Sequence, residues 1–238
     1  MKYSIVIPCY NEADNLDHLI EKITPLQKEF DLQYVLVENG SSDASRQIFE
    51  EKIEGRYPNI KVVYVPQNRG YGYGIQQGMK AAEGDYMGWI HADLQLQAEE
   101  LIPFFREIER HSPEEKLFLK GRRTNRSFYE KIFTFGQSAF STCLFGRKLY
   151  DIGAIPVVFS RCLAEEIGID NFPREFTMEI FTYEEAARLG YQIIRPKVKL
   201  LPREAGNSSW NRGLKSRIRL ALSIMRGSVK IKHGERPD

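Results

Sequence analysis

Short apolar runs alternate with longer amphipathic segments along the first half of the chain. Residues 3–7 and 34–37 are short apolar runs rich in β-branched residues, and further mostly apolar runs cover residues 60–65, 86–90 and 117–120. Between the first two runs, apolar side chains recur at helical spacing, at Leu16, Leu19, Ile20 and Ile23. This alternation predicts an α/β fold with a mostly parallel central sheet and helices on both of its faces.

The second half of the chain is less regular. An aromatic-rich helical stretch follows residue 125. Strands are expected near residues 151–159 and 191–201, and helices near residues 161–168, 177–189 and 212–227. From Arg203 onward, cationic residues clearly outnumber acidic ones, so the chain as given ends in a basic segment.

Polar loops follow the predicted strands, where parallel sheets bind their ligands. The loop at residues 91–95 holds Asp93 and Gln95, whose oxygens suit a hard cation that bridges a diphosphate. Asp93 as the cap of a following helix is an equally good interpretation. Glu38 ends another apolar run and can accept hydrogen bonds from a nucleobase or a ribose, whereas Asp43 is the better candidate for a helix cap.

Glycines and arginines mark three further loops. Gly70, Gly72, Gly74 and Gly78 allow the backbone to approach a ligand closely, but their spacing is not the GxGxxG of dinucleotide binders and argues against hydride transfer. Arg122 and Arg123 follow the run at 117–120, and Arg203 precedes a Gly- and Ser-rich segment. Guanidinium groups there suit phosphate oxygens, although surface arginines without a ligand explain the pattern as well.

Composition excludes several classes of protein. The 238 residues are 42% hydrophobic and 28% charged, as in ordinary globular chains, and a net charge of +2 gives no reason to expect nucleic-acid binding. Cys9, Cys143 and Cys162 are too far apart for a CxxC pair and too few for a disulfide framework, which favours a reducing cytoplasm. No apolar run reaches the length of a bilayer, so we expect no transmembrane segment.

The loops, in this order, resemble those of inverting family 2 glycosyltransferases of the GT-A fold, and are similar to the polyprenyl-phosphate sugar synthases such as dolichyl-phosphate mannose synthase. The similarity runs from Ile5 to about Trp210. Its matching pieces lie at residues 5–12, 38–43, 68–78, 91–95 and 203–208. The chain departs from the family pattern at Glu38-Asn39 and at His91, where the family has aspartates. It departs again at residues 153–156, where this chain has Gly-Ala-Ile-Pro and the family has Thr-Ser-Gly-Phe.

The resemblance implies hexose transfer from a nucleotide-diphosphate sugar with inversion, assisted by Mn²⁺ or Mg²⁺. It implies a glycosyltransferase domain over residues 1–210, with a nucleotide-binding half at 1–125 and an acceptor half at 126–210, and a basic helix or tail at 211–238. The implied catalytic residues are Asp93, Arg123, Glu179 and Arg203, and the implied metal ligands are His91, Asp93 and Gln95. The implied nucleotide-binding residues are Pro8, Tyr10, Asn11, Glu12, Glu38, Asn39, Asn68, Gly70, Gly74 and Ala92.

The acceptor stays open between two classes. A polyprenyl phosphate is already an anion and needs no general base, whereas a saccharide hydroxyl needs one, for which Glu179 is the candidate. The aromatic stretch at residues 128–145 and the basic C-terminal segment favour a lipid and peripheral contact with the inner face of a membrane. Core packing is the stronger alternative for the aromatics. A nucleotidyltransferase and a non-catalytic nucleotide-binding descendant are the rival functions.

Overall fold

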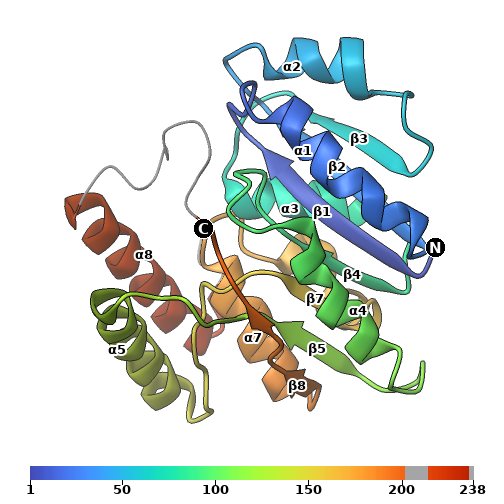
Figure 1. The fold of residues 1–238 in the computed structure, drawn as a ribbon. Helices are drawn as coiled ribbons and strands as arrows, with labels where there is room; N and C mark the ends of the chain where they lie inside the picture. The colour runs from blue at the N-terminus through green and yellow to red at the C-terminus, as the bar shows by residue number, and fades with distance from the viewer. Residues whose placement is uncertain (202–213, 236–238) are drawn as a thin grey trace.

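A seven-stranded sheet forms the centre of the molecule in the computed structural model, which describes residues 1–201 and 214–235. Its strands lie in the order β3-β2-β1-β4-β7-β5-β8 (Figure 1). They are β1 (Tyr3–Cys9), β2 (Leu32–Asn39), β3 (Ile60–Val65), β4 (Tyr86–Trp89), β5 (Leu117–Lys120), β7 (Val157–Ser160) and β8 (Gln192–Ile194). Only β7 runs antiparallel to its neighbours, β4 and β5, so the prediction of a mostly parallel sheet is confirmed.

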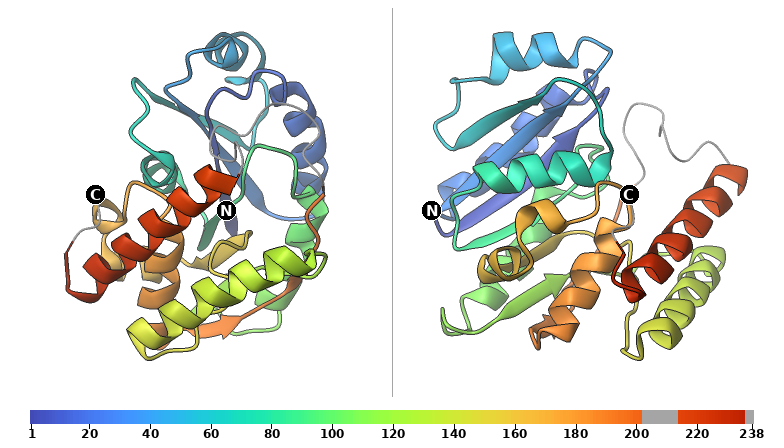
Figure 2. Two further views of the ribbon diagram at one scale, coloured as in Figure 1. Left: turned by 90° about the vertical axis from the view of Figure 1, so that its left-hand side faces the viewer. Right: turned by 180° about the vertical axis from the view of Figure 1, so that it is seen from behind.

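Helices cover both faces of this sheet, as expected. On one face lie α1 (Leu16–Ile23) and α4 (Ile102–Ile108), and on the other α3 (Tyr71–Ala81), α6 (Cys162–Ile167) and α7 (Met178–Arg188) (Figures 1 and 2). The short α2 (Ser45–Ile48) lies beyond the β3 edge (Figure 1). Helix α1 buries the four apolar positions that predicted it. The strands β1, β2 and β5 are almost wholly buried, because helices cover them from both sides.

Two of the expected strands are shorter than predicted. The strand expected near 151–159 begins only at Val157, because Asp151 adopts a positive φ of 51° and a turn joins Ala154 N to Asp151 O at 3.0 Å. The strand expected near 191–201 divides at Pro196, which has no N–H to donate, into β8 and β9 (Lys197–Val198). Strand β9 pairs in parallel with β6 (Arg122–Arg123) in a second, two-stranded sheet.

Two long helices stand beside the main body and pack against each other. They are α5 (Phe128–Phe145) and α8 (Leu214–Lys232), which lie side by side in both views of Figure 2. Helix α5 begins with a capping box, in which Ser127 and Glu130 satisfy each other's backbone N–H groups. Within the described residues, no helix is long and apolar enough to cross a bilayer.

Candidate active site

The ends of β1 and β2 meet at the carboxyl edge of the sheet, and a set of hydrogen bonds ties their loops together. Asn11 Oδ1 accepts the Ser42 N–H at 2.8 Å, and Ser41 Oγ accepts the Asn11 N–H at 3.1 Å. Asp43 accepts the N–H groups of Ala13 at 3.2 Å and of Ser45 at 2.9 Å. Asp43 therefore has a structural role, as expected, although the N-cap residue of α2 is Ala44 and not Asp43. Asn11 holds the loop of β1 against that of β2.

Glu38 is the last residue but one of β2, next to these loops, and it is completely buried. Its Oε1 accepts the Ser41 N–H at 2.6 Å, but its Oε2 is buried and has no hydrogen-bond partner among the described residues. A buried carboxylate oxygen without a partner loses its hydration and gains nothing in return. This oxygen is therefore suited to a ligand that donates a hydrogen bond. Pro8 lies in β1 opposite Val37, and Tyr10 and Glu12 lie in the loop that follows, next to Glu38, since Cys9 pairs with Glu38 across the strands.

The glycines at the start of α3 make room for the protein itself. A Cβ on Gly70 would lie 2.5 Å from Arg174 O, and one on Gly72 would lie 2.3 Å from Pro173 O. A Cβ on Gly74 would come within 2.8 Å of the side chain of Asn39, whose Nδ2 donates to Gly70 O at 3.1 Å. The close backbone approach that the sequence predicts is thus made to residues 173–175 and to Asn39. Asn68 closes the preceding turn by accepting the Gly70 N–H at 2.9 Å.

The loop after β4 holds Asp93 without placing it at a helix end. Asp93 Oδ1 accepts the Gln95 N–H at 3.2 Å across Leu94, which has a positive φ of 59°. The next helical turn begins only at Ala98, so the helix-cap interpretation of Asp93 is wrong. Asp93 and Ala92 are buried, whereas His91 and Gln95 are half-buried. The Gln95 backbone O accepts the Leu201 N–H at 2.7 Å, and Arg203 follows just outside the described residues.

A buried network links this loop to the acceptor half. Glu179, in the first turn of α7, accepts hydrogen bonds from Trp89 Nε1 at 2.7 Å and from the Tyr71 hydroxyl at 3.2 Å through Oε1. Its Oε2 accepts Lys120 Nζ at 2.5 Å, and Lys120 is completely buried at the end of β5. Burial lowers the pKa of Lys120, and the charge of Glu179 opposes that shift. His91 Nε2 lies 3.0 Å from the Tyr71 hydroxyl and extends the network to the loop of Asp93.

Sequence reasoning missed three members of this network, namely Tyr71, Trp89 and Lys120. The chain did carry one signal, because Lys120 ends an otherwise apolar strand that the pattern already predicted to be buried. A lysine in such a place is seldom fully buried without an anionic partner. The partner, Glu179, is 59 residues away along the chain, and only the fold brings the two together.

Arg123 is held by a carboxylate of its own. Its Nε and Nη2 both bind Asp151 Oδ1, the former at 3.0 Å, and Arg126 Nη1 lies 3.5 Å from the same oxygen. Burial disfavours the charged form of Asp151, but the hydrogen bonds and charge of Arg123 outweigh burial and bring the pKa of Asp151 below its usual value. Arg123 is thereby fixed in orientation, with 13% of its side chain exposed.

The donor set fits a divalent cation that is shared with a ligand. Within the described residues, no group of three or more His, Cys, Asp or Glu side chains could enclose a metal ion. His91, Asp93 and Gln95 supply one imidazole, one carboxylate and one amide, all from a single loop. Mn²⁺ accepts such ligands, and both Mn²⁺ and Mg²⁺ complete their coordination with phosphate oxygens. These residues therefore suit a cation bound together with a diphosphate.

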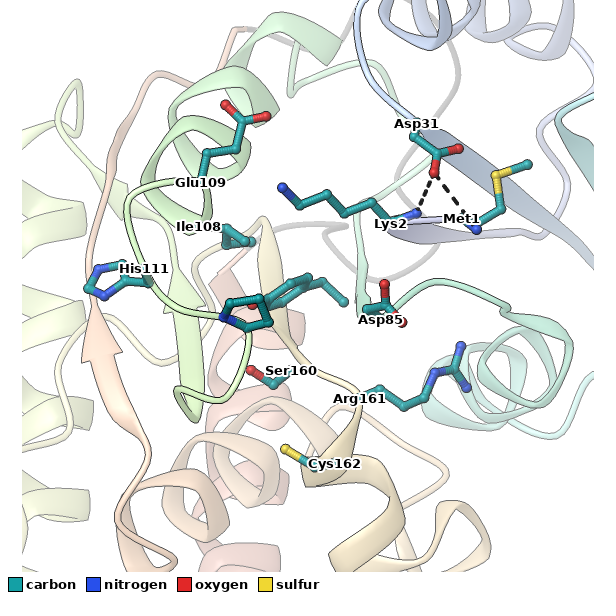
Figure 3. Close-up of a pocket in the computed structure, with 12 residues that line it drawn as sticks. Met1, Lys2, Asp31, Asp85, Ile108, Glu109, His111, Ser160, Arg161 and Cys162 are labelled. Carbon is teal, nitrogen blue, oxygen red and sulfur yellow. Dashed lines mark hydrogen bonds and ion pairs between the residues drawn. The ribbon is translucent and has the colours of Figure 1, made fainter.

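A separate hollow of about 770 Å³ lies at the opposite, amino edge of the sheet (Figure 3). Lys2 at the start of β1, Asp85 before β4 and Ser160 at the end of β7 line it. None of the predicted site residues contributes to this hollow. Asp85 can therefore serve as a control for Asp93 in mutagenesis, because both are acidic residues and they lie at opposite ends of β4.

Comparison with known proteins agrees with this architecture. Residues 4–114 match the family model described as glycosyl transferase family 2. The chain belongs to that family. It is 31% identical over 164 residues to the undecaprenyl-phosphate 4-deoxy-4-formamido-L-arabinose transferase of Proteus mirabilis, covering 67% of this chain and 49% of that relative. It is 30% identical over 140 residues to the dolichol-phosphate mannosyltransferase of Pyrococcus furiosus, covering 57% of this chain and 39% of that relative.

Solved structures show the same fold. Glucosyl-3-phosphoglycerate synthase from Mycobacterium tuberculosis, crystallised with Mn²⁺, UDP and glucosyl-3-phosphoglycerate, superposes with a TM-score of 0.70 at 18% identity. The match covers 98% of this chain and 80% of that one, and it confirms the GT-A fold. The chain spans about half the length of the family 2 relatives from Proteus and Photorhabdus, at 49% and 50%.

Proposed function

We propose that this protein transfers a hexose from a nucleotide-diphosphate sugar to a polyprenyl phosphate, with inversion at the anomeric carbon. The observation that carries the proposal is the placement of Glu38 in the last two residues of β2 and of Asp93 in the loop after β4, the two strands that flank β1 in the sheet. Glu38 Oε2 is a buried oxygen that can accept a hydrogen bond from a ligand, and Asp93 is the carboxylate in the loop of residues 91–95, which would hold the cation. Together they suit the two ends of a nucleoside diphosphate.

In the proposed reaction, a phosphate oxygen of the acceptor forms a bond to the anomeric carbon on the face opposite the diphosphate. The bond from that carbon to the donor's diphosphate breaks, and the nucleoside diphosphate leaves. A divalent cation, when bound, stabilises the negative charge of this leaving group. Asp93, with His91 and Gln95, would hold the cation, while Arg123 and Arg203 add positive charge near the diphosphate. Pro8, Tyr10, Asn11, Glu12 and Ala92 would line the nucleotide.

The bonding of Glu179 favours a phosphate acceptor over a hydroxyl acceptor. Both of its oxygens already accept hydrogen bonds, from Trp89, Tyr71 and Lys120. A carboxylate so occupied must break a bond before it can take a proton, and a hydroxyl acceptor needs a base to take one. A lipid phosphate is already ionised. The names of the relatives, which specify undecaprenyl phosphate and dolichol phosphate as acceptors, support the same choice.

Helix α5 supports a lipid acceptor because, among its described side chains, polar ones are buried and several large apolar ones are exposed. Its buried side carries Thr134, Ser138 and Ser141, and Ser138 Oγ accepts the Asp151 N–H at 3.1 Å. Its exposed side carries three large apolar side chains at positions i, i+4 and i+7: Phe128 at 72% exposure, Ile132 at 55% and Phe135 at 68%. We call these three residues the α5 outer stripe. Exposed apolar surface of this kind marks a site of association.

Charge on the neighbouring helix points to an anionic bilayer as the partner of this stripe. The exposed side of α8 carries Leu222 and Val229 together with the cations Arg219, Arg226, Lys230 and Lys232. Apolar side chains flanked by cations are typical of helices that lie in the headgroup region. Core packing does account for Phe145, which is buried, and for Leu144, which packs against the core, at the far end of α5. We infer peripheral contact with the cytoplasmic face of a membrane, where a polyprenyl phosphate would be presented.

A donor screen tests the proposal. The purified protein would be incubated with UDP-, GDP- and TDP-hexoses, with Mn²⁺ or Mg²⁺, and with or without polyprenyl phosphate, and release of nucleoside diphosphate would be measured. We expect one donor to be consumed in an acceptor-dependent way, loss of this activity in Asp93→Ala and retention in Asp85→Ala. Release of inorganic diphosphate from a nucleoside triphosphate and a sugar phosphate would instead indicate a nucleotidyltransferase. No turnover with any donor would favour the non-catalytic alternative.

A further inference from the structure

His91 stands where the family pattern has an aspartate, and the structure constrains which of its nitrogens can serve the site. A neutral imidazole carries its proton on one nitrogen and a lone pair on the other, and only the latter can bind a cation or accept a hydrogen bond. The partners of a histidine decide between the two forms. For His91, the partner among the described residues is the Tyr71 hydroxyl, 3.0 Å from Nε2.

The direction of the Tyr71 hydroxyl follows from Glu179. That carboxylate pairs with the Lys120 ammonium at 2.5 Å and also accepts the Trp89 N–H, so it is ionised and can only accept. The Tyr71 hydroxyl, 3.2 Å from Glu179 Oε1, must therefore donate its one proton to this oxygen. The hydroxyl has one proton and two lone pairs, so once it donates to Glu179 it has only acceptor capacity left for other partners.

A hydroxyl that donates to Glu179 can only accept from His91. His91 Nε2 must then carry a hydrogen, and the lone pair lies on Nδ1. Among the described residues, Nδ1 has no hydrogen-bond partner, and the ring is half-buried. The Tyr71 ring is itself held in place, stacked on Phe176 at a centroid distance of 4.8 Å and edge-on to the His91 ring at 5.4 Å.

We propose that Tyr71 is a positioning residue that fixes His91 as the Nε2–H tautomer, so that Nδ1 is the nitrogen available to the cation of the proposed reaction. The inference rests on the proposed function for the presence of that cation. In this arrangement, the chain Lys120–Glu179–Tyr71–His91 compensates for the missing first aspartate. It fixes which of the two ring nitrogens of His91 carries the lone pair, as the outer partners of metal-bound histidines do.

Nitrogen NMR tests the tautomer directly and without any activity. The chain has only four histidines, so long-range ¹H–¹⁵N spectra of protein labelled at histidine can be assigned with a His91→Gln variant. We expect the Nε2–H form for His91 in the wild type, a mixture of forms in Tyr71→Phe, and the wild-type form in Tyr73→Phe. Tyr73 is the matched control because it lies on the same helix turn and its ring contacts Arg69 and Arg174. An Nδ1–H form in the wild type would overturn the proposal.

Mn²⁺ binding supplies a second readout, measured by electron paramagnetic resonance in the presence of the nucleoside diphosphate of the donor. We expect Tyr71→Phe to weaken Mn²⁺ binding by about 10-fold or more, as loss of such outer partners does, and Tyr73→Phe to leave it unchanged. Asparagine can place an oxygen near the position of Nδ1, and glutamine near that of Nε2. His91→Asn should therefore keep more affinity than His91→Gln, and the reverse order would refute the assignment of Nδ1.

The outcomes separate this inference from the proposed function. The expected tautomer and Mn²⁺ affinities in a protein that transfers no sugar would contradict the proposed function and support the role of Tyr71. Sugar transfer by a protein whose His91 tautomer and Mn²⁺ affinity are insensitive to Tyr71→Phe would do the opposite. A wild-type protein that binds no Mn²⁺ even with the nucleoside diphosphate would overturn both.

Discussion

Replacement of Lys120 by methionine removes one half of the buried ion pair that anchors the candidate site. The Lys120 ammonium is inaccessible to solvent and lies 2.5 Å from Glu179 Oε2, while the Glu179 side chain is only 8% exposed. Methionine keeps an unbranched chain of similar length but leaves the carboxylate without its counter-ion. Glu179 then retains only the hydrogen bonds from Trp89 and Tyr71.

The expected cost follows from this burial. Removing one partner of a buried ion pair typically costs about 3–5 kcal/mol, because the remaining charge is uncompensated. Total stabilities of single domains are about 5–15 kcal/mol, so the effect should be large. We expect Lys120→Met to lower the free energy of unfolding by about 3–5 kcal/mol. Glu179→Gln in the same chain removes the stranded charge, so the double variant should be more stable than Lys120→Met alone.

Lys116→Met is the matched control, at the residue just before β5. Lys116 pairs with Glu166 at 2.8 Å, but the two side chains are 49% and 33% exposed. Exposed pairs contribute at most about 1 kcal/mol. Urea unfolding of the wild type and the three variants at neutral pH and constant salt gives the comparison. If Lys120→Met lowered the free energy of unfolding no more than Lys116→Met, the Lys120–Glu179 pair would not anchor the network. The assignment of the His91 tautomer, which depends on an ionised Glu179, would then lose its support.

Three further predictions follow from the site and its surroundings. Glu38→Gln should weaken binding of the donor nucleotide, measured by calorimetry, by about 10-fold or more, the loss expected for a hydrogen bond to a charged group; unchanged affinity would place the nucleotide elsewhere. Asp151→Asn should lower stability at neutral pH, because the pKa of Asp151 is lowered in the folded state. The difference from the wild type should begin to shrink as the pH falls past the ordinary carboxyl value of 3.8, and it should vanish only once the pH is below the lowered folded-state pKa and the carboxylate is protonated; a difference that stays constant as the pH falls through this range would contradict the prediction. The double variant Phe128→Ser with Phe135→Ser, in the α5 outer stripe, should reduce retention on anionic liposomes at low salt by about 10-fold or more, since burial of each side chain contributes about 1.5–3 kcal/mol. Tyr57→Ser, a control that precedes β3, should leave retention unchanged. Equal retention of the two variants would contradict a membrane role for α5.

The sequence pattern predicted the parallel part of the fold because its central strands β1, β2 and β4 are buried on both faces and are therefore mostly apolar. It could not predict that β7 enters the sheet antiparallel between β4 and β5, since that pairing depends on contacts between distant segments. The aromatic stretch illustrates a different limit. Helical spacing alone does not say which side faces the core, and the outward side of α5 became evident only from the partners of Thr134 and Ser138.

The sequence could predict those parts of the candidate site that depend on residues next to a strand, and not those that depend on contacts between distant segments. Glu38, His91 and Asp93 each follow an apolar run, so their position at the carboxyl edge followed from strand polarity. The glycines at 70, 72 and 74 indicated a close approach, but the segment that approaches, residues 173–175, is about 100 residues away. The roles of the implied site residues in binding and catalysis stay predictions, and Arg203 lies outside the described residues.

Detection of a glycosylated lipid phosphate would show directly that this protein transfers a hexose to a polyprenyl phosphate. The protein would be incubated with its donor nucleotide sugar, Mn²⁺ or Mg²⁺ and vesicles that contain polyprenyl phosphate, and the lipid extract would be examined by mass spectrometry. We expect a hexosyl phosphate of the polyprenol, formed in equal amount with the nucleoside diphosphate and absent with Asp93→Ala. Sugar that appears only on a saccharide hydroxyl, with the lipid phosphate unmodified, would contradict it.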